Sequence, residues 1–207
     1  MTTFTDAADT WNRRFAGAGE HYLFGRAPNA WLQTHAAWPA GARVLCVADG
    51  EGRNSVWLAQ QGLLVDAFDI AEVGVQKARA LATDAGVAVN YSVADVDGWP
   101  WPVAHYDGVA AIFVQFADPD MRTRLFVRLQ QCLKPGGVLL LQGYTPRQLE
   151  FRTGGPGQIE HLYTEALLRE AFAGMDIVTL EDYEADIREG NGHHGRSALI
   201  GLVARKR

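Results

Sequence analysis

A short turn, Asp49 to Gly52, carries the residues best suited to bind a ligand. It lies between the apolar run Val44 to Val47 and an amphipathic stretch that begins at Arg53. Two glycines remove the Cβ atoms that would keep a ligand off the backbone, and the unpaired N–H groups that open the next helix point into the space above the turn. We expect a ligand there. The pattern alone also fits a dinucleotide site, or an ordinary strand-to-helix turn without a ligand.

Two further acids follow predicted strands. Asp69 closes an apolar run 17 residues after Gly52, and Asp95 closes the next one. In an open parallel sheet, ligands bind beyond the carboxyl ends of the strands. One carboxylate there can accept both hydroxyls of a ribose, and the other can accept the exocyclic amine of an adenine. Together the two acids predict an adenosine group, although Asp is also common after strands as a turn or cap residue.

His193, His194 and Arg196 are the candidates for chemistry on a substrate. They lie in the polar stretch 188–196, which we expect to be the loop of a hairpin. If this loop folds over the strand ends, His194 can act as a general base while Arg196 holds an anion. A polar turn in solvent is the alternative. A metal site is disfavoured, because adjacent histidines diverge and no further ligand spacing accompanies them.

The elements that must position these residues alternate regularly. Short apolar runs alternate with amphipathic stretches, which predicts a parallel sheet covered by helices on both faces, because each parallel crossover supplies a covering helix. The expected strands are 44–47, 64–69, 87–93, 106–114 and 138–144, and the expected helices are 53–61, 73–84, 118–133 and one from residue 164. Two last strands, 176–187 and 197–204, form an antiparallel hairpin.

The chain before the first strand is expected to be a helical segment, residues 1–39. Trp11 and Phe15 have helical i, i+4 spacing, and residues 29–38 read as a short helix that ends at Pro39. This segment either covers an open sheet edge or caps the ligand. With residues 40–207 as the core, we expect a single domain.

Composition excludes several classes of protein. The 207 residues are 48% hydrophobic and 21% charged, and the formal net charge of −5 gives no electrostatic footprint for nucleic acid. No apolar run is long enough to cross a bilayer and the amino terminus does not read as a signal peptide, so we expect a cytoplasmic protein without membrane contact. Cys46 and Cys132 read as buried small hydrophobes, without a disulfide or a metal.

The motifs together resemble the class I S-adenosylmethionine-dependent methyltransferases. The resemblance rests on VLCVADGEGRN, Asp69, Asp95, YDGVAAIFVQF, LKPGGVLLL and the closing hairpin, and it covers residues 40–207. PNAWL, GEGRNS and the final ARKR are similar to the tellurite-resistance branch of that class. The implied fold is a doubly wound, Rossmann-like α/β sheet of seven strands in the order 3-2-1-4-5-7-6, the last strand antiparallel.

The resemblance implies S-adenosyl-L-methionine as cofactor, with S-adenosyl-L-homocysteine as product. The family pattern has an acid where Cys46 stands and a glycine where Ala48 stands, so Asp49 or Arg14 must hold the methionine end of the cofactor. The implied cofactor residues are Arg14, Ala48, Asp49, Gly50, Gly52, Asn54, Asp69, Ile70, Ala94, Asp95, Val96, Phe113 and Gln115. The implied substrate residues are Phe116, Tyr163, His193 and Arg196, with His194 catalytic and no metal.

The implied reaction is in-line methyl transfer to a small-molecule acceptor. The cofactor is already activated, so the protein needs only to position the acceptor and exclude water, and no nucleophilic Ser or Cys is required. By position, Gln115 would orient the acceptor and Phe116 would offer its ring to the cationic sulfur. A nicotinamide-dependent oxidoreductase and a non-catalytic S-adenosylmethionine-binding protein are the alternatives. We expect a monomer or weak homodimer.

Overall fold

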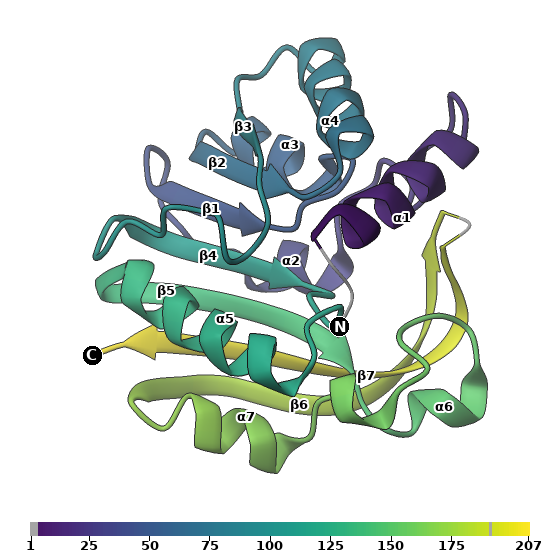
Figure 1. Cartoon of the computed structure of the whole chain (residues 1–207). Coiled ribbons are helices and arrows are strands. Elements are labelled where there is room, and N and C mark those ends of the chain that lie inside the picture. Colours follow the sequence, from purple (N-terminus) through teal and green to yellow (C-terminus); the bar gives the residue numbers. More distant parts are fainter. Residues whose placement is uncertain (1–3, 191) are drawn as a thin grey trace.

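A computed structural model describes residues 4–190 and 192–207, and its centre is a seven-stranded sheet. The strand order is β3-β2-β1-β4-β5-β7-β6 (Figure 1). β1 pairs in parallel with β2 and β4, and β7 runs antiparallel to both β5 and β6. The predicted fold, its strand order and its closing antiparallel hairpin are confirmed.

The first five strands and three helices form the parallel, doubly wound part. The strands are β1 Arg43–Val47, β2 Leu64–Asp69, β3 Asn90–Val93, β4 Tyr106–Ile112 and β5 Leu133–Tyr144, and the crossover helices are α3 Arg53–Gln60, α4 Glu72–Asp84 and α5 Pro119–Cys132. Strand order reverses between β1 and β4, because β2 leads away from β1 on one side and β4 lies on the other. Ligands of such sheets bind at this reversal, beyond the carboxyl ends of the strands.

Strand β5 begins earlier than the expected strand 138–144. Helix α5 starts at the cap of Asp118, whose side chain accepts the N–H of Met121, and ends at Cys132. β5 follows directly at Leu133, which pairs with Tyr106. A register shift in this pairing accommodates the glycines Gly136 and Gly137.

The closing hairpin is longer than predicted. β6 spans Met175–Glu189 and β7 spans His193–Lys206, and they pair as far as Glu189 with His193. The stretch expected to be a loop is therefore mostly strand, and His193, His194 and Arg196 lie within β7. Pairing of successive backbone groups outweighs the polar, glycine-rich composition that suggested a loop.

The segment before β1 wraps around the molecule. Helix α1, Phe4–Gly17, lies at the edge of the sheet toward which β1 and β4 point, and the tip of the β6–β7 hairpin rises beside it (Figure 1). Helix α2, Ala30–His35, packs on the sheet, where the ring of Trp31 fills the space beside Gly201. Trp38 likewise lies against Gly108. The chain thus passes from the ligand edge to the back of the sheet.

Shorter elements connect β5 with β6. They are α6 Gln148–Phe151, the 3₁₀ turn Ile159–His161 and α7 Glu165–Ala171. Buried apolar side chains form a cluster on each face of the sheet: Leu139 and Leu141 of β5 belong to one, and Leu140 belongs to the other. In the described part of the chain, no helix is both long and apolar enough to cross a membrane.

Candidate active site

The turn after β1 has the backbone geometry of a ligand cradle. Ala48, Gly50 and Gly52 adopt positive φ angles of 49°, 60° and 89°. A Cβ on Gly52 would lie 2.7 Å from Cβ of Ala78 and 2.9 Å from the Tyr91 hydroxyl, so this position admits no side chain. The glycine is required because the turn is both left-handed and pressed against α4.

Asp69 braces this turn from the end of β2. Its carboxylate accepts the N–H of Gly50 at 2.9 Å and that of Ala71 at 2.9 Å. Burial raises the pKa of Asp69 to about 6, although these backbone hydrogen bonds act to lower it. The predicted residues Gly50 and Asp69 therefore meet at the carboxyl edge of the sheet.

Asp49 adds a second acid to the same place. It accepts a short hydrogen bond from the hydroxyl of Ser55, which also contacts the hydroxyl of Tyr91 at 2.8 Å. Burial, helped by the neighbouring charge of Asp69, raises the pKa of Asp49 to about 7, although the hydrogen bond from Ser55 acts to lower it. Two carboxylates, one half-buried and one buried, whose pKa values are raised form a site suited to a cation and to hydroxyl donors.

The residues that follow β2 and β3 lie side by side. Asp69 pairs with Val93 in the sheet, and the N–H of Ala94 donates to the Asp69 carbonyl at 3.0 Å. The next residue, Asp95, is half-buried and its carboxylate accepts the N–H of Gly98. Val96 is buried in the core. Ile70, half-buried, completes the rim next to Asp69.

Asn54 points away from this rim. It is buried on α3, and its side-chain oxygen accepts the backbone N–H of Asn29 at 2.9 Å. Its amide thus ties the N-terminal segment to α3. The sequence placed Asn54 near the turn, but its side chain is committed to Asn29.

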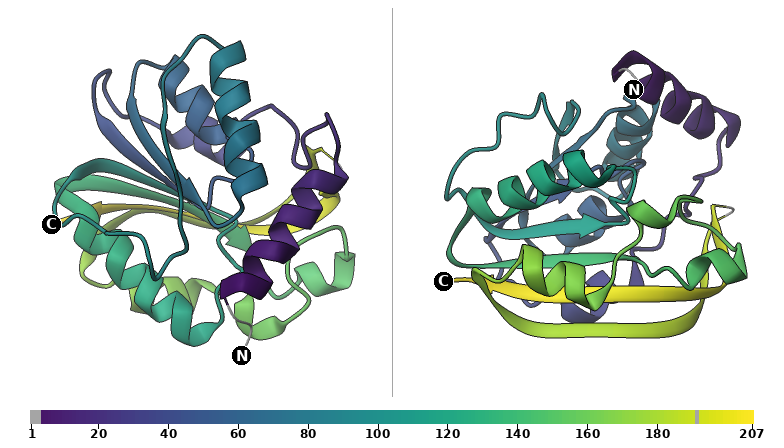
Figure 2. Two further views of the ribbon diagram at one scale, coloured as in Figure 1. Left: turned by 45° about the horizontal axis from the view of Figure 1, so that its top comes forward. Right: turned by 60° about the horizontal axis from the view of Figure 1, so that its bottom comes forward.

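Helix α1 lies across the cradle. Phe15 is buried, and a Cβ on Gly50 would lie only 3.2 Å from its ring. The backbone N–H of Leu23 donates to Glu51 at 2.7 Å, and Lys77 pairs with Glu51 at 2.7 Å. Figure 2 shows α1 crossing the ends of the strands. Of the two roles expected for the N-terminal segment, the position is that of a cap over the turn.

Arg14 is part of this cap. Its guanidinium lies over the ring of Trp11, with 4.3 Å to the centroid, and over the ring of Phe24, with 6.0 Å to the centroid. Partial burial lowers the pKa of Arg14. The side chain is therefore held at the ligand edge by aromatic faces.

The end of β4 presents Phe113, Gln115 and Phe116. Phe113 has a positive φ of 56° and stacks on Tyr144, with 4.8 Å between ring centroids. Gln115 is buried, and its amide nitrogen donates to the carbonyls of Tyr144 at 2.9 Å and His161 at 3.0 Å. These bonds occupy the donors that were expected to orient an acceptor. Gln115 therefore acts as a clamp between loops, and Phe116 is exposed.

Tyr163 does not line a substrate pocket. It is completely buried in the apolar cluster beneath α5, where its ring contacts Phe126. The backbone N–H of Tyr163 bonds to the Tyr144 carbonyl at 3.0 Å. The expectation of a substrate role is corrected, because the residue lies within the packed core.

His194 and Arg196 also differ from their expected places. Alternation along β7 turns successive side chains to opposite faces, so His193 is buried whereas His194 is exposed. Arg196 pairs with Glu184 across the hairpin at 2.7 Å, on the exposed side. The structure brings neither His194 nor Arg196 to the strand ends, where a base and an anion-binding group were expected.

His193 lies in a cluster of rings that the sequence did not indicate. Ring centroids of Phe24, Phe113 and Tyr144 lie 4.6, 4.7 and 5.6 Å from the His193 centroid. Glu189 accepts from the His193 Nδ1 at 3.2 Å. Glu189 and His193 are four residues apart in the sequence, so their proximity could have been recognised there. Only the fold brings the three rings around His193.

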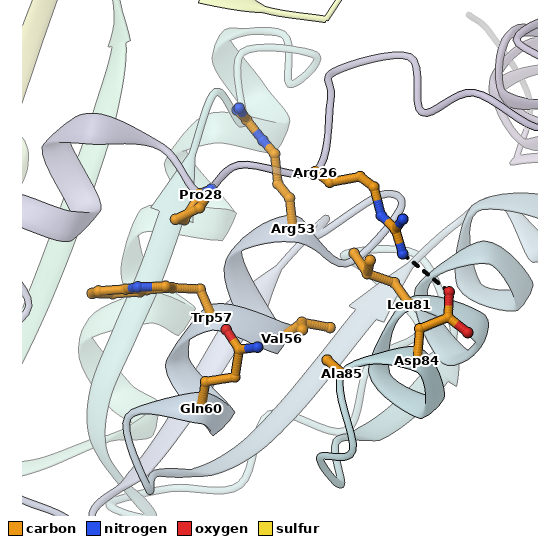
Figure 3. Close-up of a pocket in the computed structure, with 9 residues that line it drawn as sticks. All are labelled: Arg26, Pro28, Arg53, Val56, Trp57, Gln60, Leu81, Asp84 and Ala85. Atoms are coloured by element: carbon orange, nitrogen blue, oxygen red, sulfur yellow. Dashed lines mark hydrogen bonds and ion pairs between the residues drawn. The ribbon is translucent and has the colours of Figure 1, made fainter.

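A separate pocket of about 230 Å³ lies behind the cradle, between α3 and the end of α4. Figure 3 shows Arg26 reaching across it to Asp84, with which it forms an ion pair at 3.0 Å. The residues that line it are Arg26, Pro28, Arg53, Val56, Trp57, Gln60, Leu81, Asp84 and Ala85. None of the predicted site residues lines this pocket, and it is distinct from the cradle beyond the strand ends.

Part of the chain is similar to known methyltransferases. Residues 44–137 match the family model of a methyltransferase domain. A ubiquinone biosynthesis O-methyltransferase of Xanthomonas axonopodis pv. citri (strain 306) is 38% identical over 104 residues, which is 50% of this chain and 43% of that enzyme. The chain therefore spans less than half the length of this curated relative.

Solved structures with the same fold can be superimposed on almost the whole chain. A protein solved for the conversion of a disulfide bond into a thioacetal group during echinomycin biosynthesis has a TM-score of 0.77 at 17% identity, covering 97% of this chain and 92% of that one. A SAM-dependent methyltransferase of Methanosarcina mazei has a TM-score of 0.69 at 20% identity, covering 84% and 96%. Structural similarity at such low identity shows the fold but does not assign the chain to a branch of the class. The closer resemblance to the tellurite-resistance branch therefore stays a prediction. Residues 44–137 thus match a methyltransferase domain, and the chain has the fold of a solved SAM-dependent methyltransferase.

Proposed function

We propose that the protein transfers a methyl group from S-adenosyl-L-methionine to a small-molecule acceptor. The observation that carries this proposal is the pair of acids with raised pKa values, Asp49 and Asp69, beside a turn in which Gly50 and Gly52 must lack side chains. Their raised pKa values suit a ligand that brings a positive charge and hydroxyl donors, as this cofactor does. When bound, the cofactor supplies a methyl group on a cationic sulfur, ready for in-line displacement.

Different residues of the cradle bind different parts of the cofactor. Asp69 holds the ribose hydroxyls, and Asp95 with Ile70, Ala94 and the backbone of Val96 holds the adenine. Asp49, with Ala48, Gly50 and Gly52, faces the ammonium end, and Arg14 in the cap takes the carboxylate. Phe113 lies at the β1–β4 reversal, on the side where an acceptor must approach.

The cap excludes water from this place. Phe15 of α1 covers the turn, and the loop between α1 and α2 is tied down by the bond of Leu23 to Glu51, which also pairs with Lys77. Water exclusion strengthens the electrostatic contacts within the site and prevents hydrolysis of an activated group. The cap therefore has to open for the cofactor to enter.

A small-molecule acceptor is supported by the kinds of proteins that the chain resembles. The relative in Xanthomonas is named for ubiquinone biosynthesis, and the structural neighbour is named for echinomycin biosynthesis. Both ubiquinone and echinomycin are small molecules. We extend this class of acceptor to the present chain as part of the proposal.

Titration of S-adenosyl-L-homocysteine against tryptophan fluorescence tests the cofactor. We expect saturable binding by the wild type and at least about 30-fold weaker binding by Asp69→Ala, because loss of two hydrogen bonds to a charged acceptor costs about 2 kcal/mol or more. Glu184→Ala, on the exposed hairpin face, serves as the control and should bind as the wild type does. Absence of saturable binding, or equal binding by Asp69→Ala, would contradict the proposal.

The two alternative functions predict different outcomes in binding and product-release assays. A nicotinamide-dependent oxidoreductase would bind NADH, although Asp49 and Asp69 would repel its pyrophosphate. A non-catalytic binding protein would bind S-adenosyl-L-methionine without releasing S-adenosyl-L-homocysteine for any member of an acceptor panel. Release of that product with one acceptor of the panel distinguishes the proposed activity from both.

A further inference from the structure

The buried pair Glu189–His193 has no part in the cofactor cradle, yet it lies beside it. His193 packs on Phe113, the residue that directly follows β4, at 4.7 Å between ring centroids. Since β4 flanks the reversal of strand order, this pair lies next to the place where such sheets bind their ligands. It has the geometry of a base and the group that orients it.

Hydrogen bonding fixes which nitrogen of His193 carries the proton. Burial alone would raise the pKa of Glu189, but the hydrogen bond from His193 and the charge of Arg53 outweigh it and lower that pKa to about 2. Glu189 is therefore an ionised acceptor, and Nδ1 of His193, 3.2 Å from it, must carry the proton. The lone pair of the imidazole is then at Nε2, for which the described residues provide no hydrogen-bond partner.

Glu189 is held firmly in this orientation. Arg53 of α3 pairs with it at 2.8 Å, and the amide of Asn29 donates to it at 2.9 Å. Its carboxylate is thus bound from α3, from the N-terminal segment and from β7. Such support keeps the imidazole ring fixed, which is the role of the third group in an activated base.

The pKa of His193 keeps the ring neutral. Burial lowers this pKa, the hydrogen bond and charge of Glu189 raise it, and the positive charges of Arg53 and Arg14 lower it again. These are the charged groups that face His193 from β6, α3 and α1. A neutral imidazole with a free Nε2 can accept a proton near neutral pH.

A buried hydroxyl beside His193 has no partner. Tyr144 is 1% exposed, and its hydroxyl makes no hydrogen bond among the described residues. A Cβ on Gly154 would lie 3.3 Å from that hydroxyl and 3.2 Å from the His193 ring, so both groups lie close to the Gly154 backbone and to each other. An unpaired buried hydroxyl is costly and indicates a ligand atom that can accept its proton.

The surroundings of the pair are flat and apolar. Phe24, Phe113 and Tyr144 present rings to His193 within 5.6 Å. Phe24 comes from the loop before α2 and is only half-buried, so an acceptor can take its place when the cap opens. Planar aromatic or enolic molecules fit between such rings.

We propose that His193, oriented by Glu189, accepts the proton of a planar hydroxylated acceptor, a phenol or enol, while Tyr144 donates a hydrogen bond to the same oxygen. The acceptor O–H bond breaks, its electron pair stays on oxygen, and the proton forms an N–H bond at Nε2. The product is an imidazolium beside the Glu189 carboxylate. This inference rests on the proposed function, which it deepens by naming the class of acceptor.

Binding of 4-nitrophenol tests this inference, because its phenolate has an absorption band that the neutral phenol lacks. At a pH below the probe's own pKa, we expect the wild type to bind it and to show the phenolate band, whether or not S-adenosyl-L-homocysteine is present. His193→Gln should lose at least about 90% of that band, a loss of about tenfold in ionisation or 1.4 kcal/mol. His194→Gln, the exposed neighbour, should keep it.

A positioning role for Glu189 gives a separate signal. In Glu189→Gln the band should appear only at higher pH, and Glu189→Asp should restore part of the shift, whereas a purely structural role would change affinity without moving the pH profile. Unchanged binding of S-adenosyl-L-homocysteine shows that each variant is folded. A wild type that binds no probe or shows no phenolate band, an unchanged His193→Gln, or loss of the band in His194→Gln overturns the inference. Failure of S-adenosyl-L-homocysteine to bind overturns the proposed function instead. The phenolate band measured without S-adenosyl-L-homocysteine then still tests the role of His193.

Discussion

At the scale of single residues, the carboxylates of Asp49 and Asp69 have unusual pKa values. Asp49 and Asp69 have pKa values of about 7 and 6, against an ordinary value of 3.8, chiefly because of burial. In the cofactor-free protein, the folded state therefore holds protons that the unfolded chain has released between about pH 4 and 7. It follows that these groups make the folded state less stable as pH rises through that window.

Cofactor binding should depend on pH for the same reason. The ribose hydroxyls and the ammonium prefer ionised carboxylates, so we expect affinity for S-adenosyl-L-homocysteine to rise by about tenfold from pH 5 to pH 7.5, with release of protons on binding. Calorimetry at pH 6.5 in buffers of different ionisation enthalpy measures the protons released. Asp49→Asn should release fewer protons than the wild type. An affinity that is flat across this range would contradict the assignment of both acids.

At the scale of elements, the cap decides whether the site is closed. Helix α1 is anchored by Phe15, which is 2% exposed and lies over the turn and over Gly74 of α4. The chain after it is tied to Glu51 through Leu23, and Gly192 at the hairpin tip donates to the Leu23 carbonyl at 3.0 Å. The cap and the hairpin are therefore coupled, so access to the cradle and to His193 changes together.

Removal of the Phe15 ring should release α1 alone. Phe15→Ala removes a buried ring worth about 3 kcal/mol, so the amides of α1 should exchange about 100-fold faster while those of β1 and β4 keep their rates. Hydrogen exchange with mass spectrometry measures both regions at once. Ala16→Ser, on the exposed face of the same helix, is the matched control and should have a small effect. Equal exchange of α1 in Phe15→Ala and wild type would show that the cap is held elsewhere.

At the scale of the whole molecule, one sheet separates two apolar clusters. Leu141 lies in the cluster beneath α5, and Leu140 lies in the cluster beneath α3 and α4; both side chains are fully buried. Because neighbouring residues of one strand build the two clusters, neither cluster can unfold while the other keeps its strand. A single domain therefore remains our expectation.

Urea unfolding checks this cooperativity. Leu140→Ala and Leu141→Ala should each lower the free energy of unfolding by about 3 kcal/mol, and tryptophan fluorescence and far-ultraviolet circular dichroism should report one coincident transition. Val178→Ala, whose side chain is 61% exposed on β6, should change stability by less than about 0.5 kcal/mol. Two separate transitions, each sensitive to one leucine, would contradict a single domain.

Much of the fold could be read from the sequence because its signals are local. Alternation of apolar runs with helical stretches and the glycines after β1 both depend on neighbours along the chain. The strand expected at 87–93 was shortened to Asn90–Val93, and the hairpin was lengthened, since strand ends depend on a partner. Asp69 and Asp95 were recognisable because strand ends in a parallel sheet share one edge.

The sequence by itself determined the α/β class of fold and the acids beside the turn, because periodicity and glycine geometry are properties of short segments. The strand order was implied by the resemblance to the methyltransferase class. Only the tertiary structure decided which side chains meet. It turned His193 inward and His194 outward, used Gln115 and Asn54 as clamps, and buried Tyr163 in the core. The physical reason is that strand alternation fixes a face only once the register is set, and that register comes from pairing with residues far away in the chain.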